Sequence, residues 1–170
     1  RIHALSRGQR AQLALILAAS GTPEVLIFDD PAMGLDVAMR RELLGSLIEL
    51  LSSRGCAVLF SSHILSDVER IADRVGILHQ GGLIVDAPLD ELKRRVEKRH
   101  WVPRNGRTDP GVAGLLRSRA VEGGFELTLL DLDGPREAEL RASAARVSER
   151  IDLDLEELFL ELTTTPEALR

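Results

Sequence analysis

The sequence predicts an α/β fold, in which a parallel sheet flanked by helices is followed by a small α+β unit. Two apolar runs, at 25–28 and 56–60, have the length and β-branched content of strands that are covered on both faces. A helical pattern lies between them, and such a strand–helix–strand crossover places its two strands parallel in one sheet. After residue 100 the composition shifts, and an alternating run at 124–130 indicates a half-buried strand of the second unit.

One helix is predicted before the first strand and one after it in the chain. Ser6 is a suitable N-cap for a helix over 6–20, which Gly21 and Pro23 would end. Asp36 can cap a helix over 37–53, with Gly55 after it. The buried side of this second helix would hold its apolar residues Leu43, Leu44, Leu47, Ile48 and Leu51.

Three side chains that could bind a ligand or take part in catalysis follow the two strands. Asp29 and Asp30 stand at the end of the first strand, and His63 follows the second. Ligands of parallel sheets bind at the carboxyl ends of the strands, so we expect all three side chains at one edge. Paired acids suit Mg²⁺, and a histidine beside them is a candidate for contacting phosphate or water. The alternative is that the acids cap the next turn and the histidine is structural.

The start of the first helix is a second candidate site. Free backbone N–H groups and the helix dipole make a capped helix start suitable for binding an anion. The sequence Ser6-Arg7-Gly8 stands at this position. The alternative is that Ser6 is a plain N-cap with no ligand.

Composition excludes several classes of protein. The 170 residues are 44% hydrophobic and 29% charged, which is typical of a globular protein. No apolar run approaches the roughly 20 residues that a membrane helix needs, so a membrane role would come through a partner. The net charge of −5 gives no global reason to bind nucleic acid. Cys56 is the only cysteine, which excludes an internal disulfide and fits a small core residue.

The rest of the chain is predicted as a series of short elements. A helix over 64–72 precedes a hairpin of strands 75–79 and 83–85, and helices are predicted at 136–148 and 155–162. Residues 101–106 are predicted as a linker or edge segment. A charged helix over 86–98 would expose a solvated basic face of Lys93, Arg94, Arg95, Lys98 and Arg99. The predicted domains are 1–99 and 100–170.

Three motifs, in this order, resemble the second half of an ATP-binding cassette (ABC) ATPase, whose sheet is of the P-loop NTPase kind. They are Leu-Ser-Arg-Gly-Gln at 5–9, Leu-Ile-Phe-Asp-Asp-Pro-x-x-Gly-Leu-Asp at 26–36 and Ser-Ser-His at 61–63. The match covers about residues 5–95, and the spacing between the motifs suits the family. The ending at 155–162 resembles that of transporter subunits of the exporter kind.

The resemblance implies contacts with ATP across a dimer interface. Ser6, Gly8 and Gln9 match the signature motif, which touches the γ-phosphate of ATP held by the opposite subunit. Asp36 matches the D-loop aspartate, which spans the interface. His63 matches the switch histidine, which holds the γ-phosphate and positions water.

The resemblance also assigns the two acids. Asp29 matches the Walker B acid that orders Mg²⁺, and Asp30 takes the place of the glutamate that polarises the attacking water. Aspartate is shorter by one C–C bond, about 1.5 Å, and a general base must come within roughly 2.6–3.2 Å of its proton. We therefore expect hydrolysis to be slowed but not abolished. Two further departures, Arg7 for glycine and Ala32 for serine or threonine, should matter little.

The given sequence contains no phosphate-binding loop of the form Gly-x-x-x-x-Gly-Lys-Ser/Thr. We expect the chain to be a fragment of a full-length ATPase that lacks the N-terminal Walker A portion. We expect this fragment to be inactive alone. The resemblance implies ATP and Mg²⁺ as cofactors. It also implies a second nucleotide-binding subunit in a head-to-tail dimer, a transmembrane permease, no nucleic-acid partner, and a location on the cytoplasmic face of the membrane.

Two alternatives remain open from the sequence. The chain could be a degenerate subunit that completes the site of a partner without hydrolysing ATP itself, since Asp30 and the missing loop both lean that way. It could also come from a non-transport cassette ATPase of the DNA-repair and chromosome-maintenance kind. The exporter-like ending and the absence of a basic surface argue against that second alternative.

Overall fold

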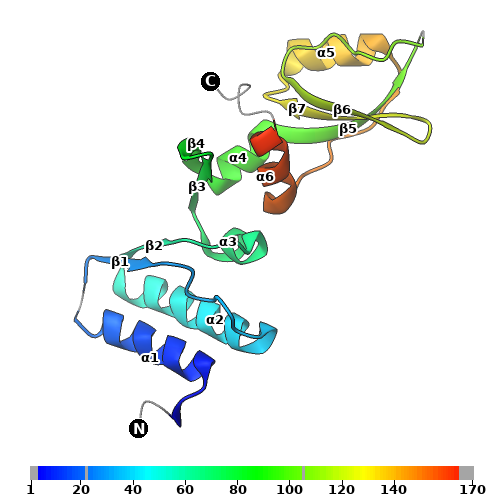
Figure 1. The fold of residues 1–170 in the computed structure, drawn as a ribbon. Helices are drawn as coiled ribbons and strands as arrows, with labels where there is room; N and C mark the ends of the chain where they lie inside the picture. Colours follow the sequence, from blue (N-terminus) through cyan, green and yellow to red (C-terminus); the bar gives the residue numbers. More distant parts are fainter. Residues whose placement is uncertain (1–3, 22, 105, 165–170) are drawn as a thin grey trace. The chain divides into compact units, whose positions relative to one another are not determined.

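The computed structural model describes residues 4–21, 23–104 and 106–164, with 51–54 described as backbone only. The chain divides into two compact units, of which unit 1 ends at Ile71 and unit 2 begins at Ala72. Both units contain helices and strands (Figure 1), so the predicted α/β class is confirmed. The division into functional domains 1–99 and 100–170 stays a prediction. None of the described helices is both long and apolar enough to cross a membrane.

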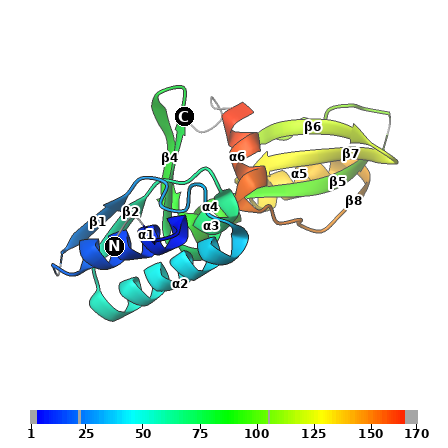
Figure 2. The ribbon, with the colours of Figure 1, turned by 60° about the horizontal axis from the view of Figure 1, so that its bottom comes forward.

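Unit 1 is a strand–helix–strand crossover, with one additional helix before it and one after it in the chain. Its elements are α1 (Arg7–Ala19), β1 (Val25–Phe28), α2 (Val37–Arg54), β2 (Ala57–Phe60) and α3 (Leu65–Ile71). The two strands are parallel, as predicted, and pair in register from Val25 with Ala57 to Phe28 with Phe60. Both long helices lie on the same side of this two-stranded sheet (Figures 1 and 2). The core between them is formed by Leu15, Ala32, Leu43, Leu44 and Leu47.

The prediction that both strands are covered on both faces is wrong. Leu26 is buried against Cys56, but Ile27 is 73% and Leu59 is 63% exposed. The reason is that α1 and α2 pack on one face, and no described element of unit 1 packs on the other. Ile48 of α2, predicted to be buried, is 41% exposed, and the side chain of Leu51 lies outside the described residues.

Unit 2 begins with the predicted hairpin, formed by β3 (Arg74–His79) and β4 (Gly82–Pro88). The predicted helix over 86–98 is shorter at both ends: β4 runs to Pro88, α4 spans Leu89–Arg95, and β5 spans Val96–Pro103. Residues 96–101 pair with β7, and this tertiary pairing overrides the helical propensity of a local sequence rich in charged residues.

A four-stranded antiparallel sheet forms the rest of unit 2, in the order β6-β7-β5-β8. β7 (Gly124–Leu130) was predicted, whereas β6 (Leu115–Val121) and β8 (Ala144–Val147) were not. The predicted helix over 136–148 is α5 (Gly134–Ser143), and it ends early because the residues after it pair with β5. The predicted C-terminal helix is confirmed as α6 (Leu155–Thr164).

Trp101 corrects the prediction of a linker at 101–106. It is fully buried on β5, an interior strand of the sheet, beside Leu127 and Leu129 of β7. Its indole N–H donates to Ser143 Oγ at the end of α5, at 3.0 Å. The sequence Trp-Val-Pro is therefore the end of a paired strand, with Trp101 in the core.

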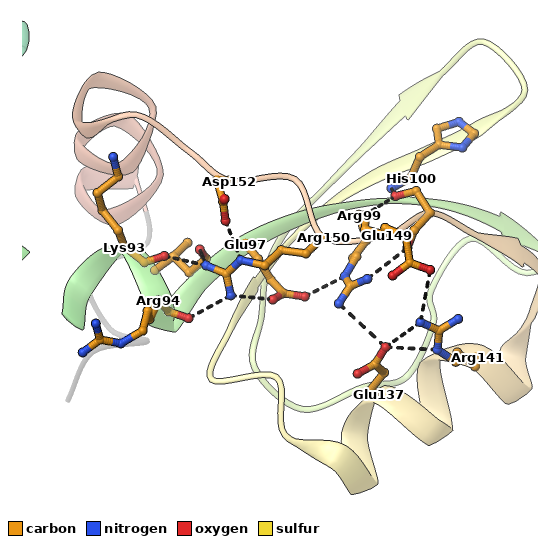
Figure 3. Close-up of polar contacts among 12 residues, drawn as sticks. Lys93, Arg94, Glu97, Arg99, His100, Glu137, Arg141, Glu149, Arg150 and Asp152 are labelled. Atoms are coloured by element: carbon orange, nitrogen blue, oxygen red, sulfur yellow. Dashed lines mark hydrogen bonds and ion pairs between the residues drawn. The ribbon is translucent and has the colours of Figure 1, made fainter. Parts of the chain in front are cut away.

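Of the predicted solvated basic face, Arg94 is exposed and the side chain of Arg95 is 40% exposed, whereas Arg99 is buried in a polar network (Figure 3). Arg99 is 6% exposed and its Nε lies 2.6 Å from Glu97 Oε1. The other oxygen of Glu97 accepts from Arg150 at 2.9 Å. The remaining donors of Arg150 bind the carboxylate of Asp152 and the carbonyls of Lys93, Arg94 and Val96. Arg150 thus caps the last turn of α4 from the segment that precedes α6.

Candidate functional site

The carboxyl edge of β1 and β2 brings the acid pair and the histidine together. Asp29 and Asp30 directly follow β1, and His63 follows β2 after two serines. Nδ1 of His63 lies 2.6 Å from Oδ2 of Asp30. The backbone N–H of Ser61 donates to Phe28 O at 2.9 Å, which continues the pairing of the strands to this edge. The prediction that the three residues share one edge is therefore confirmed for this pair by direct contact.

Asp30 has the features of a residue held for function. Its φ of +40° lies in the left-handed region, a conformation that costs a non-glycine residue about 1 kcal/mol or more. Its side chain is 19% exposed, and its Oδ1 is buried with no hydrogen-bond partner among the described residues. Buried carboxylate oxygens are almost always paired, so a free one marks a place for a water or a ligand.

Ser61 joins the two acids, a contact that was not predicted. Its Oγ accepts a hydrogen bond from the backbone N–H of Asp30 at 2.8 Å. The same hydroxyl donates to Oδ1 of Asp29 at 2.5 Å. Nothing in the sequence separates Ser61 from Ser62, because the difference depends on which serine faces β1.

The start of α1 carries the capping box formed by Ser6 and Gln9. Ser6 Oγ accepts from the N–H of Gln9 at 3.2 Å, and the side chain of Gln9 accepts from the N–H of Ser6 at 2.9 Å. The N-cap is confirmed, and it engages the side chains of both residues. No hydrogen bond or ion pair within the described part of the chain links these residues to Asp29, Asp30 or His63.

Gly8 lies against the side chain of Met39 where α1 packs on α2. A Cβ at this position would lie 2.1 Å from the terminal methyl carbon of Met39, in the first turn of α2. The N–H of Met39 donates to Oδ1 of Asp36 at 2.9 Å, so Asp36 is the predicted cap of α2. The two segments that match the signature motif and the D-loop are thus joined through Met39.

A small cavity lies behind the acid pair. Its volume is about 130 Å³, and it is lined by Asp29 together with the apolar residues Ala11, Ala14, Leu15, Phe28, Pro31, Leu43 and Leu47. Pockets for small molecules and cofactors usually have about 300–1,000 Å³. This cavity is therefore too small for a nucleotide.

The acid pair fits part of a Mg²⁺ site. Within the residues that the structure describes, no group of three or more His, Cys, Asp or Glu could enclose a metal ion. Mg²⁺ is commonly held by only one or two carboxylates, with phosphates and water completing its shell. Asp29, fixed by the hydroxyl of Ser61, can supply such a carboxylate.

Comparisons with known proteins agree with the motifs. "Bacitracin transport ATP-binding protein BcrA" of Bacillus licheniformis is 39% identical over 93 residues, which are 55% of this chain and 30% of that protein. "ABC transporter ATP-binding protein YtrB" of Bacillus subtilis is 29% identical over 162 residues, 92% of this chain and 54% of that protein. The chain is a homologue of the ATP-binding proteins of ABC transporters.

Other comparisons match only part of this ABC homologue. A protein-family profile described as "AAA domain, putative AbiEii toxin, Type IV TA system" matches residues 1–66. A solved structure titled "Structure of ATP binding subunit of ABC transporter" is 30% identical, with a TM-score of 0.47, over 55% of this chain and 38% of that one. The ABC homologue spans about a third to a half of the length of BcrA and YtrB.

Proposed function

We propose that this chain supplies the signature, Walker B and histidine motifs of the ATP-hydrolysing subunit of an ABC transporter, of the exporter type. The observation that carries the proposal is the contact between Asp30 and His63 at the carboxyl edge of a parallel strand pair. Homology to ABC transporter ATP-binding proteins supports the same conclusion.

Each residue of this edge has a task that its geometry permits. Asp29 would hold Mg²⁺, which supplies charge neutralisation at the β- and γ-phosphates of ATP. Asp30 would position the attacking water with its carboxylate, whose Oδ2 also contacts His63. His63 Nδ1 would donate to Asp30 Oδ2, because an ionised carboxylate can only accept, and Nε2 can donate to a γ-phosphate oxygen when the imidazole carries both ring protons. In phosphoryl transfer such positioning and charge stabilisation account for most of the catalysis.

The start of α1 would act on ATP held by a second subunit. In the capping box of Ser6 and Gln9, the first-turn N–H groups and the positive end of the helix dipole point toward the helix start. We therefore infer a head-to-tail pair of nucleotide-binding subunits. A membrane-spanning permease as partner and a place on the cytoplasmic face of the membrane complete this proposal.

ATP hydrolysis by the protein expressed from its complete gene tests the proposal. We expect Mg²⁺-dependent hydrolysis that His63→Ala lowers by at least about 100-fold, the lower range for one acid–base group. The matched control is His79→Ala in the β3–β4 hairpin of unit 2, which should hydrolyse ATP as the parent does. Equal rates for all three proteins would reject the assigned site.

A second candidate function is a subunit that completes the site of a partner without hydrolysing ATP. One observation favours it: Asp30 stands where the resembled family has glutamate. Mixing the chain with a partner that has a phosphate-binding loop separates the two functions. Activity that appears only in the mixture, and survives His63→Ala, would favour the second candidate.

A further inference from the structure

The hydroxyl of Ser61 is hydrogen-bonded to both acids of the site. It accepts from the backbone of Asp30 at 2.8 Å and donates to the carboxylate of Asp29 at 2.5 Å. The first bond supports a residue whose φ is +40°. The second occupies one oxygen of Asp29 and thereby sets the direction in which the other oxygen points.

We propose that Ser61 is a positioning residue, which orients Asp29 for Mg²⁺ and holds the backbone of Asp30 in place through one shared hydroxyl. This inference rests on the proposed ATPase function. Groups that hydrogen-bond to a metal ligand fix its orientation, and their loss typically weakens metal affinity or activity about 10- to 100-fold.

The neighbouring Ser62 does not have this role. Its Oγ accepts from the N–H of Ile64 at 3.0 Å, a local bond at the entry to α3. The N–H of Ser61 donates to Phe28 O, and this bond places Ser61 beside the end of β1. The assignment is thus specific to one hydroxyl of the Ser-Ser-His sequence.

Two variants of nearly equal shape isolate this hydroxyl. Ser61→Thr keeps it and adds a methyl group, whereas Ser61→Val has the same branching with a methyl group in its place. In the protein from the complete gene, we expect Ser61→Val to raise the Mg²⁺ concentration for half-maximal ATP hydrolysis by about 10-fold. Ser61→Thr should restore it, and Ser46→Ala, whose hydroxyl bonds only within α2, should match the parent.

Amide hydrogen exchange supplies a readout without ATP. In the 170-residue chain, the N–H of Asp30 should exchange faster in Ser61→Val than in Ser61→Thr, because only the first variant lacks its acceptor. The amides of the core of α2 serve as the reference for intact folding. The comparison of Ser61→Val with Ser61→Thr remains informative even if the simpler variant Ser61→Ala, which also removes volume, fails to fold.

The two proposals fail in different ways. If the parent shows no ATP hydrolysis, the proposed function is rejected, and the exchange of the Asp30 amide still decides whether Ser61 holds that residue. If the parent hydrolyses ATP and the Val and Thr variants have equal Mg²⁺ dependence, the role of Ser61 toward Asp29 is overturned. Equal exchange of the Asp30 amide in both variants would overturn its role toward Asp30.

Discussion

His63 Nδ1 lies 2.6 Å from Asp30 Oδ2, although 33 residues separate the two along the chain. The parallel pairing of β1 and β2 explains this contact, because it brings the carboxyl ends of both strands to the same edge. The pair is joined to Asp29 through Ser61 and the backbone N–H of Asp30, so four residues from two loops form one connected group. The predictions below test this group and the packing that supports it.

Asp30→Glu tests two properties of residue 30: the length of its side chain and its positive φ. A longer side chain should bring the carboxylate closer to an attacking water, so we expect ATP turnover to rise by about 10-fold, within the 10²–10⁴-fold that such a group contributes. The φ of +40° favours aspartate over glutamate, so the melting temperature should fall slightly. A turnover no faster than that of the parent would show that the length of Asp30 does not limit hydrolysis.

Gly8→Ala tests the contact between the start of α1 and α2. The added Cβ meets the side chain of Met39, and we expect a loss of about 1–2 kcal/mol in the free energy of unfolding. Met39→Ala should remove the clash, so the double variant should lose less stability than the sum of the two single variants. Chemical denaturation of the chain measures all four proteins, and strictly additive losses would contradict the contact.

Arg150→Ala tests the network in Figure 3. Its loss removes one donor from the carbonyls of the last turn of α4 and one from Glu97, so unit 2 should lose about 2–3 kcal/mol. Trp101, the only tryptophan and fully buried in unit 2, reports the unfolding by fluorescence. Arg146→Ala on β8 is the matched control and should change stability by less than about 0.5 kcal/mol. Similar stabilities for both variants would show that the network contributes little.

Asp131→Asn tests an acid-dependent contribution in unit 2. Hydrogen bonds from Arg95, at 2.9 Å to each oxygen, lower the pKa of Asp131 below its ordinary value. Since the folded-state pKa is the lower one, the stabilisation is present above the unfolded pKa, about 3.9, and is lost as the pH falls through the folded value. The stability difference between parent and variant should therefore be constant near neutral pH and shrink below about pH 4. A stability difference that does not change with pH would contradict the ion pair. Asparagine is a suitable replacement because it tolerates the φ of +52° at this position.

Local patterns predicted most of unit 1 and the geometry of its site. The caps at Ser6 and Asp36, the parallel strands and the convergence of His63 on Asp30 all follow from short-range signals and one topological rule. The choice of Ser61 over Ser62 could not be predicted, because it depends on the side of β2 that faces the acids.

Unit 2 was predicted less well because its strands are charged. Residues 96–99 carry the sequence Val-Glu-Lys-Arg, which favours a solvated helix by local propensity. In the structure they form an interior strand, since Glu97 and Arg99 neutralise each other within the network of Arg150. The partners that decide this strand, β7 and Arg150, lie about 30 and 50 residues away along the chain, and no local pattern contains them.

A double-mutant cycle on ATP hydrolysis tests the coupling of Asp30 and His63 most directly. The protein from the complete gene would be compared with Asp30→Asn, His63→Ala and the double variant under saturating Mg²⁺ and ATP. We predict that each single variant lowers turnover by at least about 100-fold and that the double variant is little worse than either, because the two residues act as one unit. Independent, multiplying losses, or activity unaffected by either change, would contradict the account.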